Sequence, residues 1–356
     1  MSVRFDRHTW MIVISGLSLG LLGALLSVWG NPVNSGICVS CFIENSVGAL
    51  GLHSNDRMQY LRPELIGFIL GAMGSAFVFR EFRSRGGSAP LPRLFAGIFL
   101  IVGCAVFIGC PIKLFLRLTA GDLTALAGVA GLAVGIWIGV RSLAAGVDPG
   151  PPKAEARGSG LLVPALFVFM LALLLVKPAF LQFSARGSAA EYAAVGIALP
   201  ASLLLGVLAQ RTRFCVTGSV RDLFLLGRRA PLTIGMVMFI GGAVMVNILT
   251  GRFNLAMYGQ PGAHTDHLWS FLGMLLVGWI SVILGGCPFR QMIKAGEGDA
   301  DAGLVVLGML LGGAIVQSWG IAAGAAGVPL AGKVAVLVGL LLCVGATLAF
   351  RTRDSS

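Results

Sequence analysis

The sequence predicts an all-α polytopic membrane protein made of two inverted-topology repeats of about five spans each, with re-entrant helical hairpins. Three observations support this fold class. The 356-residue chain is 56% hydrophobic and only 12% charged, with a mean hydropathy of +0.90, whereas soluble domains carry about 25% charged residues. Ten apolar stretches approach the length of roughly 20 residues that a membrane-crossing helix needs. The triplet Gly-Cys-Pro occurs twice, at 109–111 and again at 286–288.

The ten predicted spans fall into two sets of five. They lie at 10–29, 64–80, 94–109, 122–143, 160–177, 192–210, 232–249, 268–285, 302–320 and 332–350. The shift along the chain that superposes the two Gly-Cys-Pro triplets also carries the first five spans onto the last five. Because five is odd, the second set must enter the membrane from the opposite side, which is the inverted repeat found in many transporters. We expect the first repeat in residues 1–180 and the second in residues 181–356.

The basic residues predict that both termini lie in the cytoplasm. Cytoplasmic loops of membrane proteins collect Lys and Arg. With the N-terminus inside, 18 of the 26 basic residues fall in inside segments. Segment 144–159 then becomes a cytoplasmic linker between the fourth and fifth spans. The net charge of +11 is explained by this orientation, so we expect a lipid bilayer and no nucleic acid as a partner.

The cysteines repeat in the same register as Gly-Cys-Pro. The shift that carries Cys110 onto Cys287 also carries Cys38 onto Cys215. Cys38 and Cys215 each open an apolar stretch that is too short to cross the membrane. These stretches lie at 38–52 and 214–227. We expect re-entrant hairpins, because irregular backbone at membrane depth must be buried in protein or line a wet cavity. The alternative is an interfacial helix within a loop.

Gly-Cys-Pro predicts a helix that begins directly after each cysteine. Proline fits the first helical turn, so Cys110 and Cys287 are expected at N-caps, where free N–H groups and the positive dipole end favour anions. Two basic residues follow each motif, four positions apart and thus on one helix face. They are Lys113 with Arg117, and Arg290 with Lys294. We expect them to attract an anion; the alternative is contact with lipid phosphates at span ends.

These cysteines predict a path of thiols across the membrane. The parity of the spans places Cys38 and Cys110 toward the outer side and Cys215 and Cys287 toward the cytoplasm. Sulfur is soft and polarizable, and a thiol is a weak hydrogen-bond donor. A series of weak sites lets an ion move, where one tight site would trap it. We therefore expect transport of a small soft anion, with no enzymatic activity and no cofactor.

Cys38 and Cys41 form a C-x-x-C motif, which leaves a second function open. A zinc site would need two more ligands, and the four histidines show no matching spacing. A redox disulfide is the better alternative, because the motif faces the oxidising side in the predicted topology. The chain would then be a membrane thiol–disulfide redox protein. Gly218 stands in place of a second cysteine in the other repeat, which speaks against this alternative.

At these residues the chain resembles the YeeE/YedE sulfur-transport family, and most closely its YedE-type selenium transporters. The segments that carry the resemblance are Asn31–Phe42, Gln59–Glu64, Glu81–Ser88, Phe107–Pro111, Leu284–Arg290 and Ala295–Ala302. Asn34 and Arg62 lie within these segments, and we expect them to support the path. One departure from the family pattern is Glu44-Asn45, which stands where an Arg-Asp pair is expected, as at Arg221-Asp222.

The resemblance implies a function as well as a fold. It implies an inner-membrane permease that imports a selenium compound or a small sulfur anion such as thiosulfate. It further implies that motif cysteines pass the ion along by S–H···S contacts, and that a cytoplasmic sulfur-carrier protein of the TusA type works beside the permease. The implied positions are Cys38, Cys110 and Cys287, with Cys215 as the repeat partner.

Overall fold

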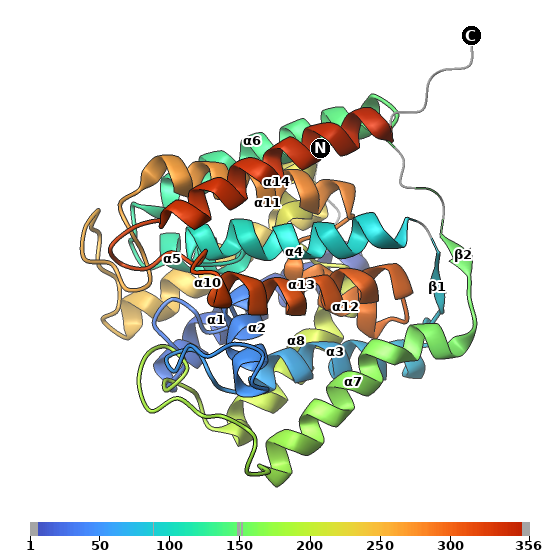
Figure 1. Cartoon of the computed structure of the whole chain (residues 1–356). Coiled ribbons are helices and arrows are strands. Elements are labelled where there is room, and N and C mark those ends of the chain that lie inside the picture. Colours follow the sequence, from blue (N-terminus) through green and yellow to red (C-terminus); the bar gives the residue numbers. More distant parts are fainter. Residues whose placement is uncertain (1–5, 88, 148–149, 151, 351–356) are drawn as a thin grey trace.

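The computed structural model describes residues 6–87, 89–147, 150 and 152–350, and these residues are mainly helical (Figure 1). Within them, ten longer helices form the body of the protein. They are α1 (Arg7–Val28), α3 (Pro63–Val78), α4 (Pro90–Phe107), α6 (Ala125–Ala144), α7 (Arg157–Val176), α8 (Val195–Thr212), α10 (Pro231–Leu249), α11 (His267–Ile283), α13 (Ala300–Ser318) and α14 (Leu330–Ala349). Each matches one predicted span, with only small differences at the ends.

The protein is an all-α polytopic membrane protein. Among the described residues, nine helices are long and apolar enough to cross a bilayer. The shorter helix α3 has 16 residues, which corresponds to a rise of about 24 Å. The hydrocarbon core of a bilayer is about 30 Å thick, so α3 must be completed by its flanking residues or by local thinning of the bilayer.

Four short helices lie between the longer ones in the chain, and each begins directly after one of the four repeat-related cysteines. They are α2 (Val39–Ala49), α5 (Pro111–Thr119), α9 (Val216–Leu225) and α12 (Pro288–Gly296). A proline begins α5 and α12. Both end just before a glycine in the left-handed region, Gly121 with φ 92° and Gly298 with φ 93°. None of the four is long enough to cross a bilayer, which takes roughly 20 residues.

The two halves of the chain interleave. Helix α1 packs on α10 and α8 packs on α3, and the repeat converts each of these pairs into the other. The pairs α4 with α13 and α11 with α6 are related in the same way. The fifth helix of each half departs from the symmetry, because α7 packs on α3 and α13 while α14 packs on α4 and α11. The division of the chain near residue 180 remains a prediction.

The offset between the halves is not uniform. The shift that carries Cys110 onto Cys287 also carries the first residue of α4 onto that of α11, and the first residue of α5 onto that of α12. Helices α3 and α10 begin at Pro63 and Pro231, which are related by a shorter shift. The difference arises because segment 50–62 separates α2 from α3, whereas only segment 226–230 separates α9 from α10. The register is therefore strict at the short helices, and the connecting loops absorb the variation.

Hydrogen bonds group the connecting segments into two faces. On the long-loop face, which comprises segments 50–62, 177–194, 250–266 and 319–329, the N–H of Ser184 donates to the carbonyl oxygen of Gln59 at 2.8 Å and the N–H of Val328 donates to Asp266 at 2.8 Å. Residues of all four segments line one cavity. On the linker face, which comprises segments 79–87, 152–156 and 297–299, the N–H of Arg83 donates to the carbonyl oxygen of Glu297 at 3.1 Å, and the N–H of Glu155 donates to that of Ser84 at 3.1 Å.

Strands β1 (Arg85–Gly86) and β2 (Lys153–Ala154) also lie on the linker face and pair antiparallel. They lie at the right of Figure 1, opposite the loops at its left. The predicted linker 144–159 contains β2, and its residues 148, 149 and 151 lie outside the described residues.

Candidate functional site

All four repeat-related cysteines occupy the N-cap of a short helix. Cys38 caps α2, Cys110 caps α5, Cys215 caps α9 and Cys287 caps α12. All four are free thiols and all are buried. A helix N-terminus presents unpaired N–H groups and carries roughly half a positive charge. The sequence therefore places each thiol where a negative charge, on sulfur or on a ligand, is stabilised.

The Gly-Cys-Pro motif folds in the same way in both halves. Before each motif, the residue at Ile108 or Gly285 adopts a left-handed backbone, with φ of 62° and 71°. A Cβ on Gly109 would lie 2.7 Å from Cδ of Lys113, and the equivalent Cβ on Gly286 would lie 2.6 Å from Cγ of Arg290. The aliphatic stem of the basic residue thus folds back over the glycine. This packing explains why the motif needs glycine directly before the cysteine.

The first-half thiol cluster consists of Cys38, Cys41 and Cys110. The Sγ atoms of Cys38 and Cys41 are 3.0 Å apart, and Cys110 interacts with Cys38. The ammonium group of Lys113 lies 3.8 Å from Sγ of Cys41. Cys38 and Cys110 are fully buried, whereas Cys41 is partly exposed. Cys41 therefore forms the accessible end of this cluster, although the repeat symmetry does not account for it.

The second-half thiol cluster consists of Cys215 and Cys287, whose Sγ atoms are 3.6 Å apart. The backbone N–H groups of Gly218 and Cys287 both point at Sγ of Cys215, at 3.4 and 3.5 Å. Two helix N-termini thus converge on one sulfur atom. This arrangement suits a thiolate or a soft anion in contact with the thiol.

A separate cavity leads to each cluster. The long-loop cavity, of about 590 Å³, is lined by Cys41, Lys113 and Glu44 among others. The linker cavity, of about 330 Å³, is lined by Cys215, Arg290 and other residues. The residues that line the first lie on or near the long-loop face, and those that line the second lie near the linker face. Each face of the protein thus has a thiol-ended cavity.

A third hollow, of about 450 Å³, lies between α4, α11 and α14 and is lined almost entirely by apolar side chains. Cys343 lines it and belongs to neither thiol cluster. Within the part of the chain that the structure describes, no group of three or more His, Cys, Asp or Glu residues is arranged to hold a metal ion.

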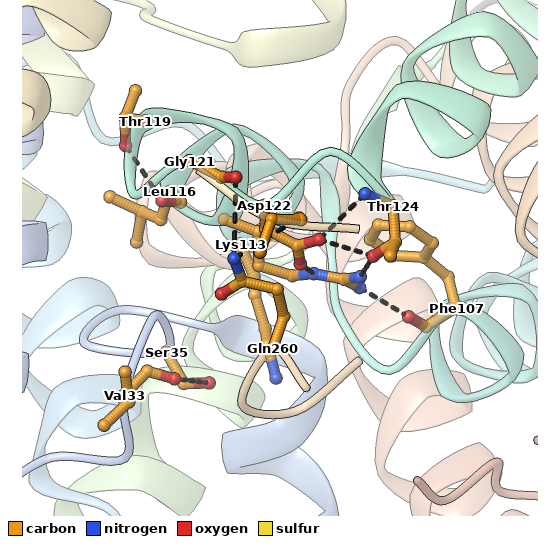
Figure 2. Close-up of polar contacts among 12 residues, drawn as sticks. Val33, Ser35, Phe107, Lys113, Leu116, Thr119, Gly121, Asp122, Thr124 and Gln260 are labelled. Atoms are coloured by element: carbon orange, nitrogen blue, oxygen red, sulfur yellow. Dashed lines mark hydrogen bonds and ion pairs between the residues drawn. The ribbon is translucent and has the colours of Figure 1, made fainter. Parts of the chain in front are cut away.

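Arg117 lies in a buried polar cluster and lines neither thiol-ended cavity. Its guanidinium contacts Asp122 at 2.7 Å, the hydroxyl of Thr124 at 2.7 Å and the carbonyl oxygen of Phe107 at 3.0 Å. Figure 2 labels the three partners, Phe107, Asp122 and Thr124. The contacts of Arg117 with them join the ends of α4 and α5 to the start of α6. Arg117 thereby fixes the position of the helix that Cys110 caps.

The residues of the second half that correspond to Lys113 and Arg117 lie at a cavity. Arg290 and Lys294 both line the linker cavity. Arg290 pairs with Glu297 at 2.8 Å, and Lys294 lies 3.7 Å from Asp299. Of the four predicted anion-attracting residues, Lys113, Arg290 and Lys294 thus line a thiol-ended cavity.

Arg62 and Asn34 line neither thiol-ended cavity. Arg62 is fully buried, donates to the Oδ1 atom of Asn45 at 2.8 Å, and places its guanidinium 4.5 Å from the ring centre of Phe42. It therefore anchors α2. Asn34 has φ 59° and lines a small void beside Arg252, so the structure does not bring it to either thiol-ended cavity.

Two further side chains complete the first-half site, and sequence analysis did not identify them. Gln317 donates to the carboxylate of Glu44, and it accepts from Asn55 at 2.7 Å. The Nδ1 atom of His53 accepts the N–H of Asn55, so its Nε2–H donates to the carbonyl oxygen of Glu44 at 2.9 Å. Burial lowers the pKa of His53, which favours this neutral form. No pattern in the sequence links these residues, because they lie on different segments.

Comparison with known proteins gives limited matches, and no family model matches the chain. The chain is 26% identical over 126 residues to a probable transporter, YedE, of Escherichia coli (strain K12). It is 27% identical over 126 residues to the probable transporter YedE of Salmonella typhimurium. Each match covers 34% of this chain and 29% of the relative. The chain therefore spans less than a third of the length of these curated relatives.

Proposed function

We propose that this protein is a transporter that imports a small sulfur- or selenium-containing anion, such as thiosulfate, along a path of cysteine thiols. One observation carries the proposal. Two cavities on opposite faces each end at a cluster of free cysteines: the linker cavity reaches the N-cap residue Cys215, and the long-loop cavity reaches Cys41, which lies 3.0 Å from the N-cap residue Cys38. An anion path needs a positive electrostatic potential, and it needs binding sites that are weak enough to release the anion. Helix N-termini supply the positive potential, and thiols supply the weak sites. The partial similarity to proteins described as probable transporters supports the same class of function.

In this proposal the anion enters the long-loop cavity, where Lys113 neutralises part of its charge. It then meets Cys41, whose thiol is 3.8 Å from the ammonium group. Cys38 and Cys110 receive it next through S–H···S contacts, and Cys287 and Cys215 pass it to the linker cavity. Each thiol is a weak donor, so no single site holds the ion tightly. Arg117 and Arg62 hold the surrounding backbone in place.

The finer features of the proposal concern location and partners. The protein lies in the inner membrane, with the linker face and both termini in the cytoplasm, since that orientation puts most basic residues inside. A cytoplasmic sulfur-carrier protein of the TusA type receives the sulfur anion at the linker face. Selenium species and thiosulfate share the soft terminal atom that thiols recognise.

Uptake by living cells tests the proposal. In cells that lack other importers, expression should raise the uptake of labelled thiosulfate or of a labelled selenium species that carries a terminal selenium atom. Cys110→Ala and Cys287→Ala should each abolish that uptake without loss of protein from the membrane. Cys343→Ala is the matched control, because this buried cysteine belongs to neither cluster. Full uptake by both cluster variants would refute the thiol path.

A second candidate function rests on the short Cys38–Cys41 distance of 3.0 Å between free thiols. Two thiols this close can form a disulfide, so a membrane thiol–disulfide redox protein is the alternative. The two candidates differ in what they require of Cys41. Redox chemistry needs both cysteines equally. Uptake that persists in Cys41→Ala but is lost in Cys38→Ala would therefore exclude the redox function.

A further inference from the structure

The two halves of the chain place side chains of opposite charge at one repeat-related position. Glu44 on α2 lines the long-loop cavity, whereas Arg221 on α9 lines the linker cavity. The shift that carries Cys38 onto Cys215 also carries Glu44 onto Arg221. An arginine keeps its charge in a protein, whereas a carboxyl group becomes neutral when it binds a proton. Only the first half therefore carries a group at this position whose charge changes with pH.

A network of three side chains holds Glu44 in one orientation. Gln317 donates its amide N–H to Oε2 of Glu44, and the amide oxygen of Gln317 accepts from Asn55 at 2.7 Å. The second contact fixes which end of the Gln317 amide faces the carboxyl group. The Nε2–H of His53 donates to the backbone carbonyl oxygen of Glu44 at 2.9 Å. The carboxyl group is thus held in place, and one of its oxygens already accepts a hydrogen bond.

The other carboxyl oxygen of Glu44, Oε1, accepts no hydrogen bond from the described residues. The residue is 4% exposed, and the space that its side chain lines is the long-loop cavity. Oε1 is not sealed within the protein, unlike Oε2 of Glu64, which is buried without a partner. A proton that reaches Glu44 from the cavity therefore binds to Oε1, because Oε2 is engaged by Gln317. The resulting O–H group is a hydrogen-bond donor.

The charges that line the long-loop cavity balance, in contrast to those of the linker cavity. Among the described residues, the long-loop cavity is lined by two basic side chains, Arg57 and Lys113, and by two acidic ones, Glu44 and Glu191. An ionised Glu44 thus opposes the entry of an anion. The described lining of the linker cavity has four cations and no acidic side chain, and the cations are Arg213, Arg221, Arg290 and Lys294.

The ionisable groups that face Glu44 come from three helices. They are Cys38 and Cys41 at the start of α2, Cys104 on α4 and Lys113 on α5. Helix α13, which packs on α2, contributes the uncharged Gln317. Helices α3 and α12 also pack on α2, but among the described residues they bring no charged side chain to Glu44. Lys113 is therefore the one cation of this group, and it also lies 3.8 Å from Sγ of Cys41.

An ionised Glu44 and a bound anion must share the single positive charge of Lys113. Two negative charges at close range disfavour each other, so the arrival of an anion favours the protonated carboxyl group. The reverse also holds, because two linked binding equilibria affect each other by the same factor. Protonation of Glu44 should therefore raise the affinity of the cavity for an anion.

We propose that Glu44 is a proton-binding site whose protonation is linked to anion binding in the long-loop cavity. A proton moves from the cavity water to Oε1 when the anion binds, and it returns to the water when the anion leaves the cavity. No bond other than this O–H bond forms or breaks. The inference rests on the proposed function and deepens it, because it makes the entry of the anion depend on the pH at the long-loop face.

Calorimetry on the purified protein tests the proposal. Thiosulfate is titrated into the detergent-solubilised protein at one pH in two buffers of different ionisation enthalpy, because a proton that the protein takes up is drawn from the buffer. The wild type should take up a proton on binding. Its affinity should fall by up to about tenfold per pH unit once the pH exceeds that at which Glu44 of the free protein loses its proton. Glu44→Gln, which keeps the size of the side chain, should bind thiosulfate without proton uptake and with little dependence on pH.

A matched control makes the result specific to Glu44. Glu191→Gln removes the same charge from the same cavity lining, at a residue that is exposed, and should keep the proton uptake. An affinity of Glu44→Gln that falls with pH as steeply as that of the wild type would show that a thiol or another group titrates, and it would refute the proposal. If Glu44→Gln fails to fold, the wild type alone decides, because equal binding enthalpies in the two buffers mean that no proton is taken up.

The outcomes separate this proposal from the proposed function. If the wild type imports thiosulfate but binds it without proton uptake, the proton site is refuted while transport stands. If the purified wild type takes up a proton with thiosulfate, Glu44→Gln does not, and cells show no import, the proton site stands and transport is refuted. If the purified wild type does not bind thiosulfate at any pH, the linkage between proton and anion is refuted outright.

Discussion

Helix packing in this protein depends on two glycines that the repeat relates. A Cβ on Gly131 of α6 would lie 2.0 Å from the carbonyl oxygen of Phe271 on α11. A Cβ on Gly308 of α13 would lie 2.1 Å from the carbonyl oxygen of Leu94 on α4. Such a carbon–oxygen contact needs about 3.3 Å. Gly131→Ala must therefore move the two backbones apart by about 1.3 Å, and no side-chain rotation can relieve the clash.

The cost follows from comparison with a glycine that has free space. A Cβ on Gly241 of α10 would meet no atom within 4 Å, so Gly241→Ala changes only the intrinsic helix propensity. That change favours alanine by about 1 kcal/mol. At Gly131 the added methyl group also overpacks against the backbone of α11, which should destabilise the protein by about 3 kcal/mol. The two variants should thus differ in unfolding free energy by about 3 kcal/mol, with Gly308→Ala close to Gly131→Ala.

Thermal unfolding of the purified variants in detergent measures this difference. A change of about 1 kcal/mol shifts the Tm of a domain of 150–250 residues by about 2–4 °C, and less for longer chains. Gly131→Ala should therefore unfold on the order of 5 °C below Gly241→Ala. Equal Tm values for these two variants would refute the close approach of α6 and α11 at this position.

Two other predictions concern buried polar groups. Arg117→Met leaves Asp122 buried without its partner at 2.7 Å and should destabilise the protein by about 3–5 kcal/mol, whereas the double variant Arg117→Met/Asp122→Leu should recover most of the loss in the same unfolding assay. Burial lowers the pKa of His53 and of His264, so below pH about 6.5 the unfolded chain binds more protons than the folded one. Stability should then fall with decreasing pH until the lowered folded pKa values are passed, by at most about 1.4 kcal/mol per pH unit for each histidine. His53→Gln should flatten this dependence in unfolding measured across pH, and an unchanged slope would contradict the assignment of a neutral imidazole.

Hydropathy and cysteine spacing predict the fold well, because both are local signals. All ten spans appear as helices at the expected places, and the short helices α2 and α9 lie within the two stretches expected to be re-entrant. The position of α10 relative to α3 is less well predicted, because a single shift between the two halves assumes that corresponding loops have equal lengths. Loops tolerate insertions at little energetic cost, so segment 50–62 lengthens without moving the cysteines.

The candidate site is harder to predict, because its partners come from distant parts of the chain. Lys113 and Arg117 share a helix face by spacing, but Gly121 turns the backbone and brings Asp122 to Arg117. One cation is thereby fixed in an ion pair and the other stays beside Cys41. The contact between Gln317 and Glu44 joins residues 273 positions apart. Local patterns carry no information about such pairs.

The interleaving of the two halves has a consequence for biogenesis. Helix α1 ends at Val28, and its main packing partner α10 begins at Pro231. Synthesis at about 5–20 residues per second separates the two by roughly 10–40 s. During that interval the glycine-rich face of α1 meets only lipid or a helper protein of the insertion machinery. Assembly of the first half therefore has to wait for helices of the second half, and a ribosome that stalls before α10 leaves the inserted helices exposed to membrane quality control.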